Sequence, residues 1–349
     1  MHMWGTLMVA LDTIRNPPQA SYTHYLDLVG SIEQLARSSN KKSLGRIMVD
    51  SVKVGPWGAA SGQPCDINSC SSPQRLVSIS ICSNETPGGC INGFSFTYVD
   101  QTGRAISSGT WGTNFIGCVT TIKMNPGEHV NHVSGMANNR GVTSLKLGTN
   151  QTEHGPYGWP SGPEFSVPLR QGKSEVAAFF GHSGDSLKAL GVYVPGRKGS
   201  PAKVGPWGGH AGSSRDLGSN MPERLQSISI RSSERSGGRI YGFSYAYLDQ
   251  NGQRIHVGPW GSKTKGQKRE FTMNEDNYIN FVSGTYDEYG ITSLKFVNSD
   301  EEVYGPFGCP TGTAFSVPMP ENGAAVGFFG RAGADGLVGF GAYVAPLEE

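Results

Sequence analysis

One short segment gathers the residue types of a hydrolytic active site. Residues 181–185 read Gly-His-Ser-Gly-Asp and so contain a serine, a histidine and an aspartate. In a catalytic triad these groups come from distant parts of the chain and meet only in the folded protein. The segment also lacks the Gly-x-Ser-x-Gly pattern of a nucleophile elbow, and no strand–turn–helix pattern follows it. We therefore predict a turn between two strands here, and no enzymatic activity.

A second segment, residues 128–132, combines a glutamate with two histidines and suggests a metal site. In a β-strand, however, His129 and His132 point to opposite faces. The sequence has no Walker loop, Rossmann glycine run or paired Cys-x-x-Cys zinc motif. We therefore expect neither a metal ion nor a cofactor.

The composition favours many short strands. Of 349 residues, 50 are glycine, 36% are apolar and only 16% are charged. Aromatic and β-branched residues are interspersed with the glycines, which is typical of strands joined by glycine turns. The net charge is +1 and no basic stripe stands out, which argues against nucleic acid as the main partner. No apolar run reaches the roughly 18–20 residues of a membrane span.

The sequence contains an internal duplication. Lys53–Gly58 (KVGPWG) recurs as Lys203–Gly208, and Arg75–Ile81 (RLVSISI) recurs as Arg224–Ile230 (RLQSISI). Further matched segments follow in the same order, 149 or 150 positions apart. They are GFSF at 93–96 with GFSY at 242–245, TSLK at 143–146 with 292–295, GPYG at 155–158 with GPFG at 305–308, and FSVP at 165–168 with 315–318. Each copy has the length of a domain.

Each copy has the pattern of an all-β domain. Leu76–Ile81 and Phe94–Tyr98 alternate apolar and polar residues, as half-buried strands do. Further strands are predicted over 143–147, 164–167 and 189–194, and Asp100–Gly103 predicts a turn. The expected domains cover residues 52–195 and 202–346, with a linker of Pro and Gly over 196–201. Residues 1–50 are expected to form a short helix, with Tyr25, Leu28, Ile32 and Leu35 on one face, or a disordered tail.

The cysteines and tryptophans can be judged against the duplication. Five of the six cysteines lie in the first copy and only Cys309 lies in the second, so a shared fold does not depend on disulfides. We favour free thiols in a reducing compartment, with Cys65–Cys70 or Cys82–Cys90 as the alternative pairs. Trp57 and Trp207 are matched, so we predict that they pack in the core. Trp159 has no counterpart and is the better candidate for an exposed contact.

In these motifs the chain resembles the jacalin-related lectins. Domains of this family commonly open with Gly-Pro-Trp-Gly, and they share the Gly-Phe-x-Phe-x-Tyr-x-Asp strand and turn, the Ile-Thr-Ser-Leu strand and the closing Phe-Phe-Gly strand. The resemblance covers residues 52–195 and 202–346. It implies two tandem β-prism domains, each with three four-stranded Greek-key sheets and one sugar site at one end. It also suggests a plant protein of the mannose-binding, cytoplasmic or nucleocytoplasmic type, with a role in stress or defence.

The resemblance places the sugar site on two loops. One is a glycine-rich turn after the first strand, of which only the outer glycines remain here, so that Gly62 and Gly212 are the candidates. The other reads Gly-x-x-x-Asp before the last strand. Its aspartate and backbone N–H groups bind sugar hydroxyls, which need an acceptor as well as donors. The corresponding residues are Gly184, Asp185, Ser186, Leu187 and Lys188 in the first copy, and Ala334, Asp335, Gly336, Leu337 and Val338 in the second.

This second loop departs from the family pattern. Lys188 and Val338 stand at the aspartate position; the lysine offers only donors, and the valine offers neither donor nor acceptor. Loss of a charged hydrogen-bond partner costs roughly 1.5–3 kcal/mol, or about ten- to over a hundredfold in affinity. Asp185 or Asp335 would supply a carboxylate only if the loop were remodelled. We therefore expect weak or absent binding of simple mannose at both sites.

The sequence thus predicts a carbohydrate-binding lectin with two non-catalytic sites, with mannose- or glucose-type glycans favoured. Two weak sites on one chain would bind clustered glycans by avidity. The expected partners are glycans or glycoproteins and other proteins, without nucleic acid or a membrane span, and a homo-oligomer is compatible with this interpretation. The alternative is a protein-interaction scaffold of lectin fold that has lost most sugar binding.

Overall fold

The computed structural model describes residues 51–67, 72–113, 116–169, 174–195, 201–218, 220–319 and 323–347. The helix or tail predicted for residues 1–50, Cys70 and nearly all of the predicted linker lie outside these residues. All the regular secondary structure in the described part consists of β-strands, as the sequence predicts. This part contains no helix that is long and apolar enough to cross a membrane.

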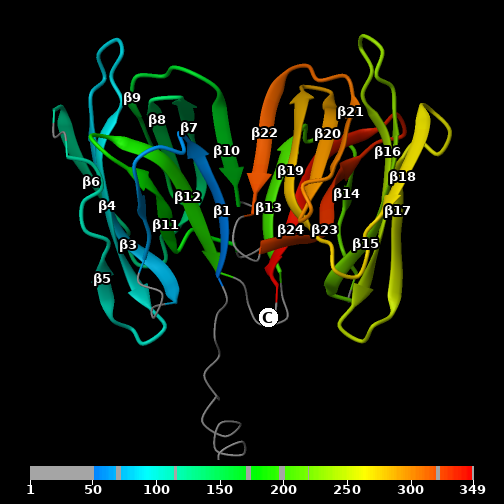
Figure 1. Ribbon diagram of the computed structural model, residues 1–349, viewed down its shortest axis with the longest axis horizontal. Coiled ribbons are helices and arrows are strands. Elements are labelled where there is room, and N and C mark those ends of the chain that lie inside the picture. The colour runs from blue at the N-terminus through cyan, green and yellow to red at the C-terminus, as the bar shows by residue number, and fades with distance from the viewer. Residues whose placement is uncertain are drawn as a thin grey trace, which may run out of the picture. The chain divides into compact units, whose positions relative to one another are not determined.

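The first copy forms three four-stranded antiparallel sheets, which is the architecture of a β-prism (Figure 1). The strand orders are β1-β12-β11-β2, β10-β7-β8-β9 and β5-β4-β3-β6. The strands are β1 (Ser51–Gly58), β2 (Gln63–Cys65), β3 (Pro73–Ser83), β4 (Ile91–Asp100), β5 (Ala105–Ser107), β6 (Cys118–Lys123), β7 (Val130–Asn138), β8 (Gly141–Thr149), β9 (Glu153–Gly158), β10 (Glu164–Pro168), β11 (Ala178–Ser183) and β12 (Leu187–Pro195).

The second copy repeats this arrangement. One sheet has the order β17-β16-β15-β18, and the other strands join into a single sheet of eight because one residue pair, Ile279 with Ala325, links two groups of strands. The strands are β13 (Ala202–Gly208), β14 (Ser213–Arg215), β15 (Pro222–Ser232), β16 (Ile240–Asp249), β17 (Arg254–Gly261), β18 (Gln267–Thr272), β19 (Ile279–Asp287), β20 (Gly290–Asn298), β21 (Val303–Gly308), β22 (Thr313–Pro318), β23 (Gly323–Ala332) and β24 (Leu337–Pro346).

The alternating pattern of the sequence explains how the sheets pack. In β4, Phe94, Phe96 and Tyr98 are all buried in the centre of the prism, and the residues between them point away from it. Burying one such side chain contributes about 1.5–3 kcal/mol. The predicted strand is therefore confirmed, and its matched strand in the second copy, β16, buries Phe243, Tyr245 and Tyr247 in the same way.

A Gly-Pro-aromatic-Gly segment occurs in three strands of the second copy. These segments are 205–208 in β13, 258–261 in β17 and 305–308 in β21. The pairing register shifts next to each of them, as in a β-bulge. The first glycine of the β13 segment, Gly205, has φ +112° and faces the Cα of Gly341 so closely that a Cβ would come within 2.8 Å. The β17 segment is a third occurrence of the motif that the comparison of the two copies does not reveal.

Candidate functional site

The two loops that the sequence singled out meet at one end of the first prism. The turn after β1 is held against the β11–β12 hairpin by a hydrogen bond from the Ala59 N–H to the Lys188 carbonyl (2.9 Å). Gly62 lies so close to the hairpin that a Cβ there would be 2.5 Å from the Ser183 carbonyl oxygen, and its φ is +92°. The remaining outer glycine of the family's turn is thus required by close packing of the two loops.

The same contact recurs in the second prism. The Gly209 N–H donates to the Val338 carbonyl (2.9 Å), and a Cβ on Gly212 would be 2.6 Å from the Ala332 carbonyl oxygen. The structure therefore brings the two predicted loops together in both copies. Leu187 and Leu337 are fully buried, so their side chains belong to the core and these two residues offer a ligand only their backbone.

In the first prism an internal ion pair occupies the site. Lys188 Nζ contacts the carboxylate of Asp185, and it also donates to Ser186 Oγ (3.1 Å) and to the Arg140 carbonyl (3.2 Å). The hydrogen bond from Lys188 holds the pKa of Asp185 below its usual range, so the carboxylate is charged and engaged. Gly184 forms the turn of the hairpin through its N–H, which donates to the Ser186 carbonyl (3.0 Å).

In the second prism the corresponding space is an open pocket of about 410 Å³. All the candidate residues of this copy line it, namely Gly212, Ala334, Asp335, Gly336, Leu337 and Val338. Asp335 is exposed, and no charged or hydrogen-bonding partner is recorded for its side chain among the described residues. The matched aspartates of the two copies therefore differ, because Lys188 neutralises Asp185 and Val338 has no donor for Asp335.

Three residues from other strand connections, which the sequence did not single out, also line this pocket: Arg239, Lys265 and Tyr289. Arg239 Nη2 forms an ion pair with Asp287 (2.9 Å), and its guanidinium lies 5.8 Å from the centre of the Tyr289 ring. Asp287 in turn accepts from the Tyr289 N–H (2.9 Å), so that the turn between β19 and β20 presents an aromatic ring that is 69% exposed. The sequence marks these three positions only by a difference between the copies, because the first copy has Cys90, Ile116 and Arg140 there.

The segments that suggested catalysis and metal binding have structural roles. Residues 181–185 end β11 and form its turn, as predicted. His132 Nε2 lies 2.9 Å from Ser166 Oγ, and His129 lies 3.8 Å from Glu175. Within the described ranges, no group of three or more His, Cys, Asp or Glu side chains is placed to hold a metal ion. Cys65, Cys82, Cys90, Cys118 and Cys309 carry free thiols.

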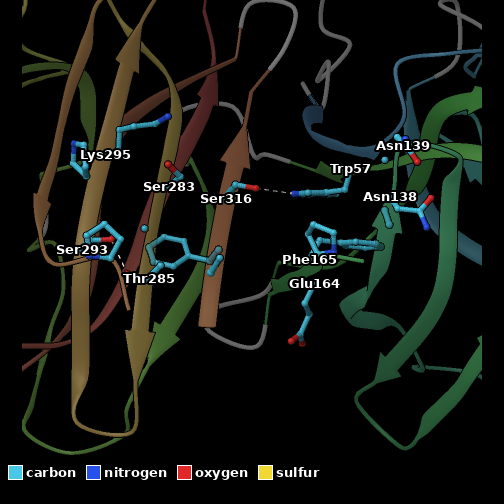
Figure 2. Close-up of a pocket in the computed structure, with 18 residues that line it drawn as sticks. Trp57, Asn138, Asn139, Glu164, Phe165, Ser283, Thr285, Ser293, Lys295 and Ser316 are labelled. Atoms are coloured by element: carbon cyan, nitrogen blue, oxygen red, sulfur yellow. Dashed lines mark hydrogen bonds between the residues drawn. The ribbon is translucent and has the colours of Figure 1, made fainter. Parts of the chain in front are cut away.

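A larger hollow of about 760 Å³ lies between the two copies (Figure 2). It contains none of the candidate loop residues. On one side Trp57 stacks on Phe165, with ring centres 5.5 Å apart, and its indole N–H donates to Ser316 Oγ of the second copy (3.1 Å). Trp57 and Trp207 are 8% and 3% exposed, which confirms the predicted core packing, and Trp159 is 39% exposed.

Comparison with known proteins identifies the domain type. The model of the Jacalin-like lectin domain matches residues 54–193 and again residues 204–343. A mannose/glucose-specific lectin of Parkia pendula is 34% identical over 314 residues, which cover 84% of this chain and 65% of the relative. Horcolin of Hordeum vulgare is 35% identical over 151 residues, 42% of this chain and 98% of its own length.

Other relatives also come from plants, in keeping with the plant origin that the resemblance suggests. Jacalin-related lectin 36 of Arabidopsis thaliana is 29% identical over 275 residues, which cover 73% of this chain and 57% of the relative. Among solved structures, a mannose binding jacalin related lectin from Ananas comosus is 32% identical, with a TM-score of 0.38, over 42% of this chain and 98% of its own. The chain belongs to the family of proteins with Jacalin-like lectin domains, and it carries two such domains in tandem.

Proposed function

We propose that this protein is a non-catalytic lectin whose second domain holds the working sugar site. The observation that carries the proposal is the open pocket around Asp335, whose exposed carboxylate has no recorded partner among the described residues. A sugar hydroxyl pair needs an acceptor beside donors, and the backbone of the 333–338 hairpin and Lys265 supply donors next to this acceptor. Tyr289 adds an aromatic surface, as is common in ligand pockets.

The sugar specificity of related lectins suggests which ligands this protein prefers. The Parkia lectin, which this chain matches over 65% of that lectin's length, is described as mannose/glucose-specific. Hexoses of this kind are neutral and present adjacent hydroxyls, which fits a pocket with one free carboxylate and several donors. We therefore propose mannose- or glucose-type glycans as the sugars that enter the pocket of the second domain.

The test compares two matched aspartates by calorimetric titration of the full chain with methyl mannoside and methyl glucoside. Asp335→Asn removes the charged acceptor of the open pocket, and we expect a loss of about tenfold or more in affinity. Asp185→Asn is the control, because Asp185 is already paired with Lys188, and it should leave binding unchanged. Absence of any binding by the unmodified chain, on a glycan array as well as in titration, would contradict the lectin function.

A protein-contact role is the second candidate, and it has support in the first domain. There Lys188 is paired with Asp185, and Ile116 and Val119, at the positions matched to Lys265 and Lys268 of the second copy, are 64% and 66% exposed. Exposed aliphatic side chains of this size are typical of contact surfaces when they cluster. Affinity capture with the full chain, compared with an Ile116→Ser and Val119→Ser variant, tests this candidate.

A further inference from the structure

The second domain carries a concentration of positive charge at one end. Although no basic stripe stands out along the sequence, basic side chains occur on the β15–β16 hairpin, the β17–β18 loop and β18. We call this set the basic face, although Lys268 and Arg269, as successive residues of β18, point to opposite sides of the sheet: Arg231, Arg235, Arg239, Lys263, Lys265, Lys268 and Arg269. At the matched positions the first copy has only uncharged residues, Cys82, Thr86, Cys90, Asn114, Ile116, Val119 and Thr120. The duplicated fold therefore does not require these cations.

The sheet β17-β16-β15-β18 brings these residues together. Arg231 in β15 is paired with Lys268 in β18, and its guanidinium donates to the Gly266 carbonyl of the β17–β18 loop (3.1 Å). Residues 232–235 and 266–267 line a common hollow of about 520 Å³. In Figure 1 the β15–β16 hairpin and the β17–β18 loop lie at the same, upper end of the second prism.

Only part of this charge is neutralised within the protein. Three of the cations form ion pairs, Arg239 with Asp287 (2.9 Å), Lys268 with Glu270 (2.7 Å) and Arg269 with Glu234 (2.8 Å). The other four, Arg231, Arg235, Lys263 and Lys265, have no carboxylate partner in the part of the chain that the structure describes. Lys265 lies instead over the ring of Tyr241, 4.6 Å from its centre. An excess of positive charge in one place attracts anionic partners.

The basic face is continuous with the sugar pocket. Arg239 and Lys265 line the pocket of Asp335, whereas Arg235 and the neighbouring residues 266–267 line the adjoining hollow. A chain of sugar units that enters the pocket at one end would therefore meet Lys265 in the pocket and Arg235 in the second hollow, which Glu234 also lines. Guanidinium and ammonium groups bind carboxylates through short, charge-assisted hydrogen bonds.

We propose that the second domain selects anionic glycans, with one sugar unit in the Asp335 pocket and the carboxylates of neighbouring units on the basic face. This inference rests on the proposed lectin function of the pocket and adds the class of glycan. Continuity with the pocket is the observation that favours a glycan over another polyanion such as a nucleic acid. The first domain, which lacks these cations, does not share the preference.

The test uses two ligands that share one sugar backbone and differ in whether their carboxyl groups are charged or methyl-esterified. Titration of the full chain with an oligomannuronate, whose units have the mannose configuration proposed for the pocket, and with its fully methyl-esterified form, each at low and at raised salt, measures the contribution of the carboxylates. We expect tighter binding of the acidic form, and a preference that shrinks as salt is raised, because added ions screen exposed charges. Binding of methyl mannoside, measured in parallel, reports on the pocket alone.

Variants separate the basic face from the pocket. Arg235→Thr with Lys263→Asn replaces two exposed cations outside the pocket by the residues of the first copy. We expect a loss of about 2- to 30-fold in affinity for the acidic ligand, from the range measured for exposed charge pairs, and no change for the neutral ligands. The matched control, Lys123→Thr with Arg254→Ala, also exchanges two exposed cations for the residues of the other copy, but away from the basic face, and should change neither affinity.

The outcomes distinguish this inference from the lectin function. Equal affinity for the acidic and esterified ligands, with mannoside binding retained, would overturn the anionic preference and leave the lectin function intact. Equal losses in the control variant would show that net charge alone acts, which also overturns it. Binding of duplex DNA without binding of any sugar would overturn both and assign the face to nucleic acid.

Discussion

Two aspartates at matched places in the two copies meet different neighbours. The hairpin of the first copy puts Lys188 beside Asp185 and forms an ion pair. The Asp185 side chain in this pair is 75% exposed. An exposed pair of this kind contributes about 0–1 kcal/mol to stability, so its main effect is on the site and not on the fold. In the second copy Val338 leaves Asp335 available to a ligand.

Restoring the acceptor should restore the first site. In a chain whose second site is silenced by Asp335→Asn, Lys188→Asp removes the ammonium group and places a carboxylate at the position used by the family. We expect mannoside affinity to rise by about tenfold or more relative to the Asp335→Asn parent. The measurement is calorimetric titration.

The control for this change is Lys188→Met in the same background. It also breaks the pair with Asp185 but adds no acceptor, so it should produce no gain. Equal behaviour of the two variants would show that the first domain no longer binds sugar for reasons beyond residue 188.

Single glycines set the shape of the site at the level of the loops. Gly212 has φ +73°, and a Cβ there would approach the Ala332 carbonyl carbon and oxygen within 2.7 Å. Gly333, on the facing hairpin, has no positive φ, and a Cβ there would meet no atom within 4 Å. The two glycines therefore differ in their tolerance of a side chain, although both lie in the same loop pair.

Gly212→Ala should lower the free energy of unfolding by roughly 1–3 kcal/mol, because it strains the backbone and pushes the two loops apart. It should also weaken sugar binding. Gly333→Ala should change stability by less than about 1 kcal/mol and in the stabilising direction. Chemical denaturation measures both, and equal destabilisation would contradict the close packing of the loops.

Turns between strands are fixed by aspartates. Asp249 Oδ1 accepts from the N–H groups of Asn251 and Gln253 (both 2.9 Å) in the β16–β17 turn, and Asp100 does the same for Thr102 (2.8 Å) and Arg104 (3.0 Å). The hydrogen bond from the Gln253 N–H is the main reason that the pKa of Asp249 lies below its usual range. For Asp100, the hydrogen bond from the Thr102 side chain is the main reason for a lowered pKa. The charged form is therefore favoured in the folded state.

This predicts a defined response to acid. A carboxyl whose pKa is lowered by folding stabilises the protein at pH values above its unfolded pKa of about 3.9, and this contribution is lost as pH falls through the lower, folded pKa. The unmodified chain should lose stability below about pH 4. The double variant Asp100→Asn with Asp249→Asn keeps an acceptor oxygen in each turn but has no carboxyl group that titrates. Its stability, measured by thermal unfolding, should fall less steeply between neutral pH and about pH 2.

The two domains contact each other through equivalent residues. Trp57 donates to Ser316 Oγ (3.1 Å), and Trp207 donates to the Ser166 carbonyl (2.9 Å). Each indole also stacks on a phenylalanine of its own domain. Reciprocal contacts of this type are those of a two-fold interface, here formed within one chain.

The hollow in this interface is unsymmetrical because the copies differ in side-chain size. Thr285 and Ala314 line it on the side of the second copy. The first copy has the larger Met136 and Glu164 at the matched positions. The two-fold relation therefore holds for the residues that are joined, but not for the acceptor atoms, which are Ser316 Oγ and the Ser166 carbonyl, or for the space around them.

Removing the indole donors should uncouple the domains. Trp57→Phe and Trp207→Phe each keep a stacked ring but lose one hydrogen bond, and we expect a loss of about 0.5–1.5 kcal/mol for each. In calorimetric unfolding the double variant should resolve two transitions where the unmodified chain has one. Trp159→Phe, at an exposed position, should change nothing. One unchanged transition in the double variant would contradict the interface.

Local patterns in the sequence were enough to predict the duplication, the strands and the two loops of each site. Alternation in Phe94–Tyr98 reports one buried face of a strand, and Asp100–Gly103 reports a turn. The third Gly-Pro-Trp-Gly segment, in β17, is equally visible as a pattern, but comparison of the two copies does not reveal it because it has no Gly-Pro counterpart in the first copy.

The different surroundings of Asp185 and Asp335 depend on the tertiary structure. The pairing of Lys188 with Asp185 depends on rotamers in a turn, and the pocket of Asp335 is completed by Arg239, Lys265 and Tyr289 from three other strand connections. The basic face and the tryptophan contacts likewise join segments that are distant in the chain. A motif specifies which residues are present, whereas charge pairing and pocket shape depend on distances that exist only after the sheets have packed.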